Sequence, residues 1–219
     1  MANYWEYNGT IHIKESPLRG LTGMGGGAVM MSQVTPGGGG GGNTWTHDGT
    51  YSGFTTGVRI DGGSNIGQSW AHEMTALTFQ WEVYINSNAS TNSWHLQVSP
   101  GWSDTGGMLI GIYSNWRVSI AGPQLGGYGF QANDNLPSNS WQTIRYAFGR
   151  VDGSNSKQRL YYNGSAQGAT NSGYNCPFIT FNNGIWGGAG RQNANTSFSV
   201  PFSGSIRNLK LMDTFDGTF

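Results

Sequence analysis

Two carboxylates close together on a β-strand would be the simplest catalytic arrangement in this chain. Glu82 is the residue from which such a pair would have to be built. Glu82 lies in the segment WEVYIN, where Tyr84 and Asn86 occupy the alternate positions that further carboxylates would need. Hydrolysis of a glycosidic bond generally uses two carboxyl groups about 5 to 9.5 Å apart, and Glu73 shares no short strand face with Glu82. We therefore expect Glu82 to be a solvated side chain on a sheet face and the protein not to be an enzyme.

Other catalytic and cofactor-binding patterns each lack a required feature. The 4 histidines have no paired spacing of the kind that zinc sites use, and they stand at His12, His47, His72 and His95. The segment GQSWA (67–71) misses the last glycine of a nucleophile elbow. The segment GMGGGA (23–28) has the glycine spacing of a dinucleotide loop, but it lacks the preceding strand, the following helix and the acidic partner. The sequence predicts no such cofactor.

Aromatic residues in glycine-rich loops indicate binding rather than catalysis. Trp102 lies in SPGWSDTGG with Asp104 beside it, Trp186 lies in NNGIWGGAG, and Tyr128 lies in LGGYGF. An exposed aromatic ring stacks on the face of a sugar, next to polar groups that fix its orientation. These four residues are our candidates for glycan binding. Aromatic side chains of this kind also cap cores or lie in subunit interfaces, and that alternative stays open.

Calcium is the one ion that the sequence leaves open. Calcium binds the oxygen ligands of acidic and amide side chains and of the backbone. The loop carboxylates to test are Asp104 and Asp134, the latter in QANDNLP. Neither belongs to a recognisable string of ligands, and ordinary turn residues explain both because Asp is common in turns. We expect no other cofactor.

The composition excludes several kinds of partner. Lys plus Arg number 11, as do Asp plus Glu, and only 10% of the 219 residues are charged. Nucleic-acid binding calls for a basic surface, so this balance argues against it, and no apolar stretch approaches the length of a membrane span. Cys176 is the only cysteine, which rules out an intrachain disulfide. The segment MANYWEYNGT has no secretory signal pattern, so we expect synthesis in a cytosol.

Alternation of apolar and polar residues predicts strands along most of the chain. In ALTFQWEVYINS one face carries Leu77, Phe79, Trp81, Val83 and Ile85. The segments NSWHLQVSP and NWRVSIAG alternate in the same way, as does TIHIKE near the start. Further strands are expected at 108–113, 142–148, 158–162, 178–181, 198–202 and 205–212. Only GQSWAHEMTAL (67–77) allows a short helical turn. Many short strands separated by turns predict an all-β, antiparallel sandwich or barrel.

The composition changes once, near residue 44. Before it lie a strand-like segment, residues 2–15, and the Gly/Met-rich stretch GLTGMGGGAVMMSQVTPGGGGGG. After it the strand pattern is continuous. We therefore divide the chain into an N-terminal strand and Gly-rich arm, residues 1–44, and a β-sandwich, residues 45–219.

Four segments in order carry a resemblance to a known superfamily. They are TTGVRIDGGSNI, LTFQWEVYINS, LPSNSWQTIRYAFGRVDGSNSKQRLYYNGSAQG and WGGAGRQNANTSFSVPFSGSIRNLKLMD. Together they resemble the concanavalin A-like lectin/glucanase superfamily, in particular its laminin G-like (LamG), pentraxin-related jelly rolls. The resemblance implies an antiparallel jelly-roll sandwich, with residues 2–15 paired beside Ser205–Met212. The residues themselves place Trp81 and Trp141 in the core and predict a two-residue turn at Asn163-Gly164.

The arm suggests an assembly role. Ordering a glycine run costs about 1–2 kcal/mol per residue, so we expect neighbouring subunits to hold it, with soft methionine side chains making the contacts. The expected contact residues are Met24, Met30, Met31, Gly37 and Gly42. LamG-like jelly rolls are also common in phage decoration and fibre proteins.

These features favour a virion structural protein, made in the host cytoplasm and placed on the head as a decoration or cement subunit, or in a fibre. Its partners would be a major capsid protein or tail and fibre proteins, together with further copies of itself. The alternative is a lectin module that recognises cell-surface glycans through its loop aromatics. A glycoside hydrolase is the third and least favoured hypothesis, because the second carboxylate is missing.

Overall fold

The computed structural model describes most of the chain beyond residue 42 and a short hairpin before it. The described residues are 4–7, 10–13, 43–55, 57–63, 70, 72–89, 93–98, 107–113, 116–122, 127–151, 155–172, 178–181, 184–188 and 202–219. The chain divides into two units, Met1–Ser32 and Gln33–Phe219. In the first, β1 (Tyr4–Tyr7) pairs antiparallel with β2 (Thr10–Ile13). The predicted division at residue 44 stays a prediction.

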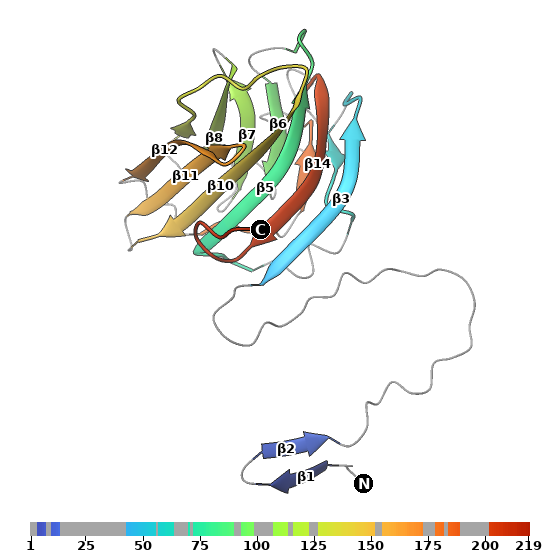
Figure 1. Ribbon diagram of the computed structural model, residues 1–219, viewed down its shortest axis with the longest axis vertical. Coiled ribbons are helices and arrows are strands. Elements are labelled where there is room, and N and C mark those ends of the chain that lie inside the picture. The colour runs from blue at the N-terminus through green and yellow to red at the C-terminus, as the bar shows by residue number, and fades with distance from the viewer. Residues whose placement is uncertain are drawn as a thin grey trace, which may run out of the picture. The chain divides into compact units, whose positions relative to one another are not determined.

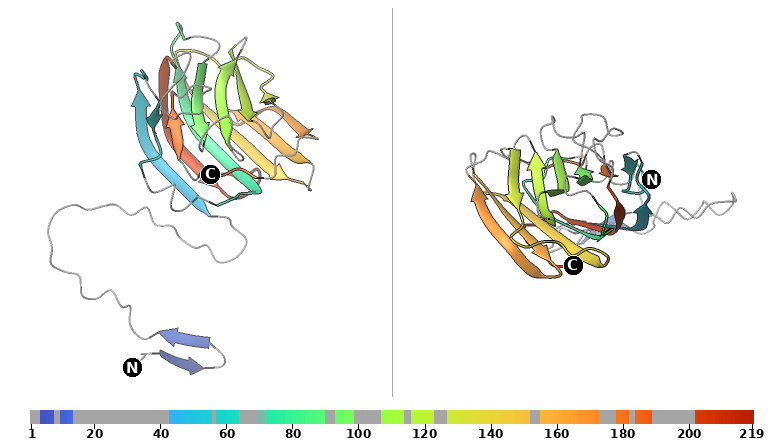
Figure 2. Two further views of the ribbon diagram at one scale, coloured as in Figure 1. Left: turned by 180° about the vertical axis from the view of Figure 1, so that it is seen from behind. Right: turned by 90° about the horizontal axis from the view of Figure 1, so that it is seen from above.

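The second unit is a sandwich of two six-stranded sheets (Figures 1 and 2). The first sheet has the order β12-β11-β10-β5-β14-β3 and the second the order β4-β13-β6-β7-β8-β9, and every pair of neighbours is antiparallel. The strands of the first sheet are β3 (Thr44–Ser52), β5 (Ala76–Ile85), β10 (Trp141–Arg150), β11 (Ser156–Tyr162), β12 (Ser165–Ser172) and β14 (Gly204–Met212). Those of the second are β4 (Val58–Arg59), β6 (Ser93–Val98), β7 (Met108–Tyr113), β8 (Arg117–Gly122), β9 (Gly127–Gln131) and β13 (Ile185–Gly187).

The central strand β5 confirms the alternation read from the sequence. Its inward side chains are all fully buried, and they are Leu77, Phe79, Trp81, Val83 and Ile85. The opposite face carries partly exposed polar and aromatic residues, Gln80, Glu82 and Tyr84 among them. One continuous apolar cluster therefore fills the space between the sheets, as expected for an antiparallel sandwich.

A β-bulge in β6 brings a histidine into this core. Trp94 pairs with Gly111 and Leu96 pairs with Ile110, so His95 is the extra residue between them. Strict alternation predicted that Leu96 and Val98 face inward, but His95 is fully buried as well. Trp81 Nε1 donates a hydrogen bond to His95 Nε2 across the sandwich at 3.3 Å. This bond places the proton of a neutral imidazole on Nδ1, and burial lowers the pKa of His95 to about 3.

The predicted turn at Asn163-Gly164 is confirmed. Both residues have positive φ, 47° and 83°, as a two-residue hairpin of this type requires. The side chain of Asn163 also holds the neighbouring strand. Its Oδ1 accepts a hydrogen bond from the backbone N–H of Thr143 at 2.8 Å, and its Nδ2 donates to Gln142 Oε1 at 2.7 Å.

The predicted pairing of the N-terminal segment is wrong, and other expectations are tested only in part. Both edges of β14 are occupied, by β3 and by β5, so residues 2–15 do not pair beside Ser205–Met212. The described residues of 67–77 show no helical turn, since Met74 forms an isolated bridge with Ile179 and β5 begins at Ala76. That bridge is all the β-structure found within 178–181, and most of 198–202 lies outside the described residues. In the part of the chain that the structure describes, no helix is long and apolar enough to span a membrane.

Trp141 lies on the surface of the sandwich and not in the core, where we expected it. In β10 the inward positions belong to Gln142, Ile144, Tyr146 and Phe148. Trp141 has the opposite parity and lies half-buried on the outer face of the first sheet. Its ring contacts Tyr84 and Arg207 there, so it belongs to the surface and not to the core.

The buried His95 predicts a dependence of stability on pH. Its pKa is about 3 in the folded protein against an ordinary value of 6.5 for histidine, so the unfolded chain takes up the proton first as the pH falls. The free energy of unfolding should therefore be fully present above pH 6.5 and should decline between pH 6.5 and 3, by at most about 1.4 kcal/mol per pH unit.

Urea unfolding between pH 7.5 and 5 measures this decline. His95→Phe removes the titrating group and should flatten the profile. A wild-type stability that stays constant over this range would contradict a buried neutral His95.

Candidate functional site

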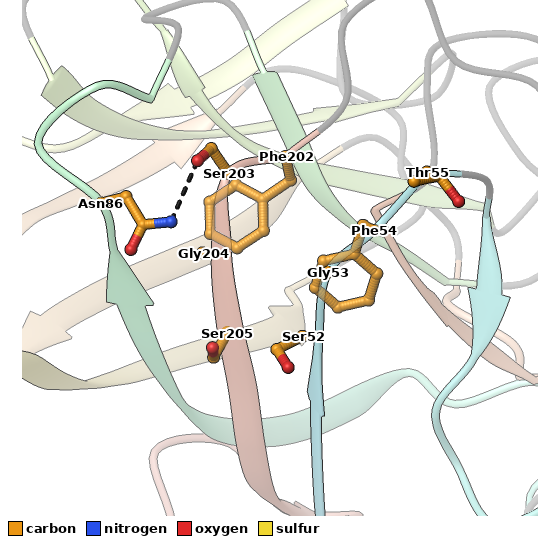
Figure 3. A pocket seen from close by; sticks show the side chains of 9 residues that line it. All are labelled: Ser52, Gly53, Phe54, Thr55, Asn86, Phe202, Ser203, Gly204 and Ser205. Atoms are coloured by element: carbon orange, nitrogen blue, oxygen red, sulfur yellow. Dashed lines mark hydrogen bonds between the residues drawn. The ribbon is translucent and has the colours of Figure 1, made fainter.

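A pocket forms where β3 and β14 separate. The two strands pair up to Ser52 and Ser205, after which Gly53 turns the chain away with a φ of 66°. The rings of Phe54 and Phe202 fill the gap, with centroids 6.0 Å apart, and both side chains are buried. Figure 3 shows the two rings side by side between the strands. They form the floor of a pocket of about 330 Å³.

Small polar side chains surround this apolar floor. The pocket is lined by the hydroxyls and amide of Ser52, Thr55, Asn86, Ser203 and Ser205. Asn86 Nδ2 donates to Ser203 Oγ at 3.0 Å, as Figure 3 shows. This bond fixes the Asn86 amide and leaves its Oδ1 without a donor among the described residues. The pocket therefore offers hydrogen-bonding groups above an aromatic base.

Gly204 allows this close packing of strand and ring. A Cβ at this position would collide with the backbone oxygen of Tyr84 and with the ring of Phe202. Only glycine lets β14 approach β5 while Phe202 folds back beneath the pocket. The sequence signal for this close packing is the segment PFSGS, part of the last of the four segments that carry the resemblance. No site was predicted there.

Next to the pocket, the outer face of the first sheet carries four side chains linked by successive contacts, Glu82, Arg207, Trp141 and Tyr84, which we call the outer-face cluster. Tyr84 and Trp141 meet edge to face at 5.7 Å, and the Arg207 Cζ lies 3.9 Å from the centre of the Trp141 ring. Arg207 Nε donates to Glu82 Oε2 at 2.7 Å. Ser205 pairs with Tyr84, and Tyr84 pairs with Trp141, so the cluster continues directly from the pocket rim.

Glu82 is held in an ion pair rather than left free in solvent. It accepts hydrogen bonds from Arg207 Nε at 2.7 Å and from Asn208 Nδ2 at 2.9 Å. Partial burial acts to raise the pKa of Glu82, but the hydrogen bonds from Asn208 and Arg207 outweigh it, and the pKa is lowered. Glu82 is thus on the sheet face as expected, in the ionised form. Glu73 lines a different, smaller pocket, together with His72 and Asp213.

The structure does not gather the predicted site residues. Trp102 and Asp104 lie outside the described residues, and for Tyr128 only the backbone, in β9, is described. Trp186 is not in a loop as predicted but in β13, where it pairs with Arg59 and Gln97 in the second sheet. It does not line the pocket between β3 and β14.

The structure likewise does not bring together the predicted calcium and assembly residues within the part of the chain that it describes. Asp134 is exposed in the connection between β9 and β10. The described residues include no group of three or more His, Cys, Asp or Glu side chains able to hold a metal. The predicted contact residues of the arm all lie outside the described residues, and they are Met24, Met30, Met31, Gly37 and Gly42.

Comparison with known proteins establishes the fold. No family model and no curated protein matches the sequence. Among solved structures, the chain is similar to the CBM40 module of the Ruminococcus gnavus IT-sialidase, with a TM-score of 0.54, 15% identity, and coverage of 79% of this chain and 94% of that one. The same module bound to α2,3 sialyllactose gives a TM-score of 0.53, 13% identity, and coverage of 77% and 93%.

A larger enzyme contains a similar part. The NanB sialidase of Streptococcus pneumoniae (K499G mutant) gives a TM-score of 0.59 with 11% identity, and the match covers 79% of this chain but only 26% of that one. These likenesses confirm the antiparallel jelly-roll sandwich that the four sequence segments suggested.

Gly204 gives a prediction for the pocket. Gly204→Ala should lower the free energy of unfolding by about 1–3 kcal/mol, because the added methyl group overpacks a site closed by backbone and ring. The neighbouring Ser205→Ala adds no atoms at a partly exposed position and should change stability by less than about 0.5 kcal/mol. Denaturant unfolding compares the two variants, and equal stabilities would contradict the close approach at Gly204.

Proposed function

We propose that this protein is a non-catalytic carbohydrate-binding module and that its glycan lies in the pocket between β3 and β14. The observation that carries the proposal is the pocket itself, which has an aromatic floor, Phe54 and Phe202, beneath a rim of hydroxyl and amide groups. A sugar presents an apolar C–H face and a set of hydroxyls. Ligand sites of this kind combine apolar walls with a few placed polar groups.

The size of the pocket fits a short glycan. Its volume of about 330 Å³ is at the lower end of ordinary small-molecule sites, which suits one or two sugar rings with the rest of the chain outside. The pocket opens beside the outer-face cluster, where the half-buried rings of Tyr84 and Trp141 offer further contact area. A longer glycan has a continuous surface to follow.

The comparisons support a binding role more than a catalytic one. A module of the same fold, covered over 93% of its length, was solved with bound sialyllactose. In the present chain the carboxylate of Glu82 is committed to Arg207 and Asn208, and no second carboxylate joins it within the outer-face cluster. We therefore propose binding without hydrolysis. The virion role, its location on a particle and its capsid or fibre partners gain no support from these neighbours and stay predictions.

A glycan array followed by isothermal titration calorimetry tests the proposal. We expect Ser52→Trp to fill the mouth of the pocket and to weaken binding at least about 10-fold. Asn86→Ala should weaken binding about 5- to 10-fold, as expected for the loss of a hydrogen bond worth roughly 1 kcal/mol. The bound glycan should release no reducing sugar on prolonged incubation.

The matched control is Thr46→Trp, which places the same ring at an exposed position on the same strand. It should bind like the wild type. Equal affinity of Ser52→Trp and Thr46→Trp would exclude the pocket as the glycan site, and an array without any bound glycan would refute the proposed function.

A further inference from the structure

Arg207 is held in place by two contacts, and its two terminal nitrogens remain available for a ligand. One side of its guanidinium is occupied through Nε by Glu82 Oε2, at 2.7 Å, and the group lies over the Trp141 ring at 3.9 Å. No described residue accepts a hydrogen bond from its two terminal nitrogens. The side chain is 35% exposed. A planar donor pair is thus fixed on an open surface.

The surrounding contacts explain why the guanidinium is rigid. Glu82 is itself fixed by Asn208 Nδ2, which donates to its other oxygen at 2.9 Å. Tyr84 packs against the edge of Trp141. Because each partner is held by a further contact, Arg207 does not need to lose side-chain freedom when a ligand binds, and such preorganisation favours affinity.

The position of Arg207 connects it to the pocket. Ser205, which lines the pocket, precedes Arg207 by two residues on β14, and both pair with outward-facing residues of β5, Tyr84 and Glu82. Two residues along a strand span about 6.6 Å, so a ligand that enters the pocket with one sugar can reach the guanidinium with the next. Lys210, on the same strand, also lowers the pKa of Glu82 through its positive charge. Glu82 therefore has a second positive neighbour besides Arg207.

We propose that the glycan of this module carries a carboxylate and that Arg207 binds it through its two terminal nitrogens. The inference rests on the proposed function and names its ligand class, an oligosaccharide ending in or containing an acidic sugar. An arginine fork matches the two oxygens of a carboxylate, and these charge-assisted hydrogen bonds are about twice as strong as neutral ones. Trp141 and Tyr84 give the ring of the acidic sugar an aromatic surface beside the charge.

The first test needs no variant. Calorimetry compares 3′-sialyllactose and tri-galacturonic acid with their methyl esters, which keep every hydroxyl and lose the charge. We expect at least one acid to bind about 10-fold more tightly than its ester at low salt. If that acid is 3′-sialyllactose, the recognised sugar is a nine-carbon keto acid, and if it is tri-galacturonic acid, the recognised sugar is a hexuronic acid. Equal affinity of acids and esters would overturn the inference and leave the proposed function standing, whereas no binding of any glycan would refute both.

Variants assign the preference to Arg207. Arg207→Lys keeps the charge and loses the fork, so it should lose most of the preference for the acid. The double variant Glu82→Gln/Arg207→Gln removes both members of the ion pair and should bind acid and ester with nearly equal affinity.

A matched control separates a specific contact from general charge. Arg159 lies on the same sheet and pairs with Asp216 instead, so Arg159→Gln removes the same charge away from the outer-face cluster and should keep the acid preference. Equal losses in Arg159→Gln and Arg207→Lys would overturn the assignment to Arg207.

Discussion

The hydrogen bond from Trp81 Nε1 to His95 Nε2 joins the two sheets inside the apolar core, and the pocket depends on it. His95 is fully buried and packs its ring against Phe202 at 5.3 Å. Phe202 in turn forms the pocket floor with Phe54. A buried imidazole without a charge partner must stay neutral, because desolvation opposes the charged form. A second link between the sheets, from Val118 N–H to the Tyr162 hydroxyl at 3.0 Å, steadies the opposite side of the sandwich.

The outer face of the first sheet is divided between a covered and an open part. Residues 213–219 lie over the front of this sheet in Figure 1, where Asp216 accepts hydrogen bonds from Arg159 and Tyr161 and Lys157 packs on Phe215. The outer-face cluster lies beyond this cover, next to the pocket. The strip that runs from the pocket to Arg207 is therefore open to the proposed ligand.

The local sequence pattern predicted the structure correctly where neighbouring residues decide it. Strict alternation in β5 and the turn at Asn163-Gly164 were read correctly, because parity and positive φ are properties of neighbouring residues. It failed where the structure depends on register between distant strands. The bulge at His95 and the outward parity of Trp141 follow from pairing with β7 and β5. The edge strand β3, TWTHDGTYS, has too few apolar residues to show a strand pattern.

The pocket was missed for the same reason. Its floor joins Phe54 to Phe202, and its rim joins Ser52 to Ser205, residues that only the pairing of β3 with β14 brings together. The loop aromatics favoured by the sequence, such as Trp186, were chosen for their local context, a glycine-rich segment with polar neighbours. The sequence did contain two signals of the site. One is Glu82, an acidic residue without a catalytic partner, and the other is the segment PFSGS around Gly204. Each marks the site once the strand order is known.

The central claim is that a glycan binds between β3 and β14, and a chemical-shift map of the ¹⁵N-labelled protein tests it most directly. The titrant is the oligosaccharide with the strongest array signal. The account predicts that the shifted amide signals belong to residues 52–55, 84–86 and 202–207. Shifts grouped instead around Trp186 and Arg59 in the second sheet, with residues 52–55 and 202–207 unchanged, would contradict it.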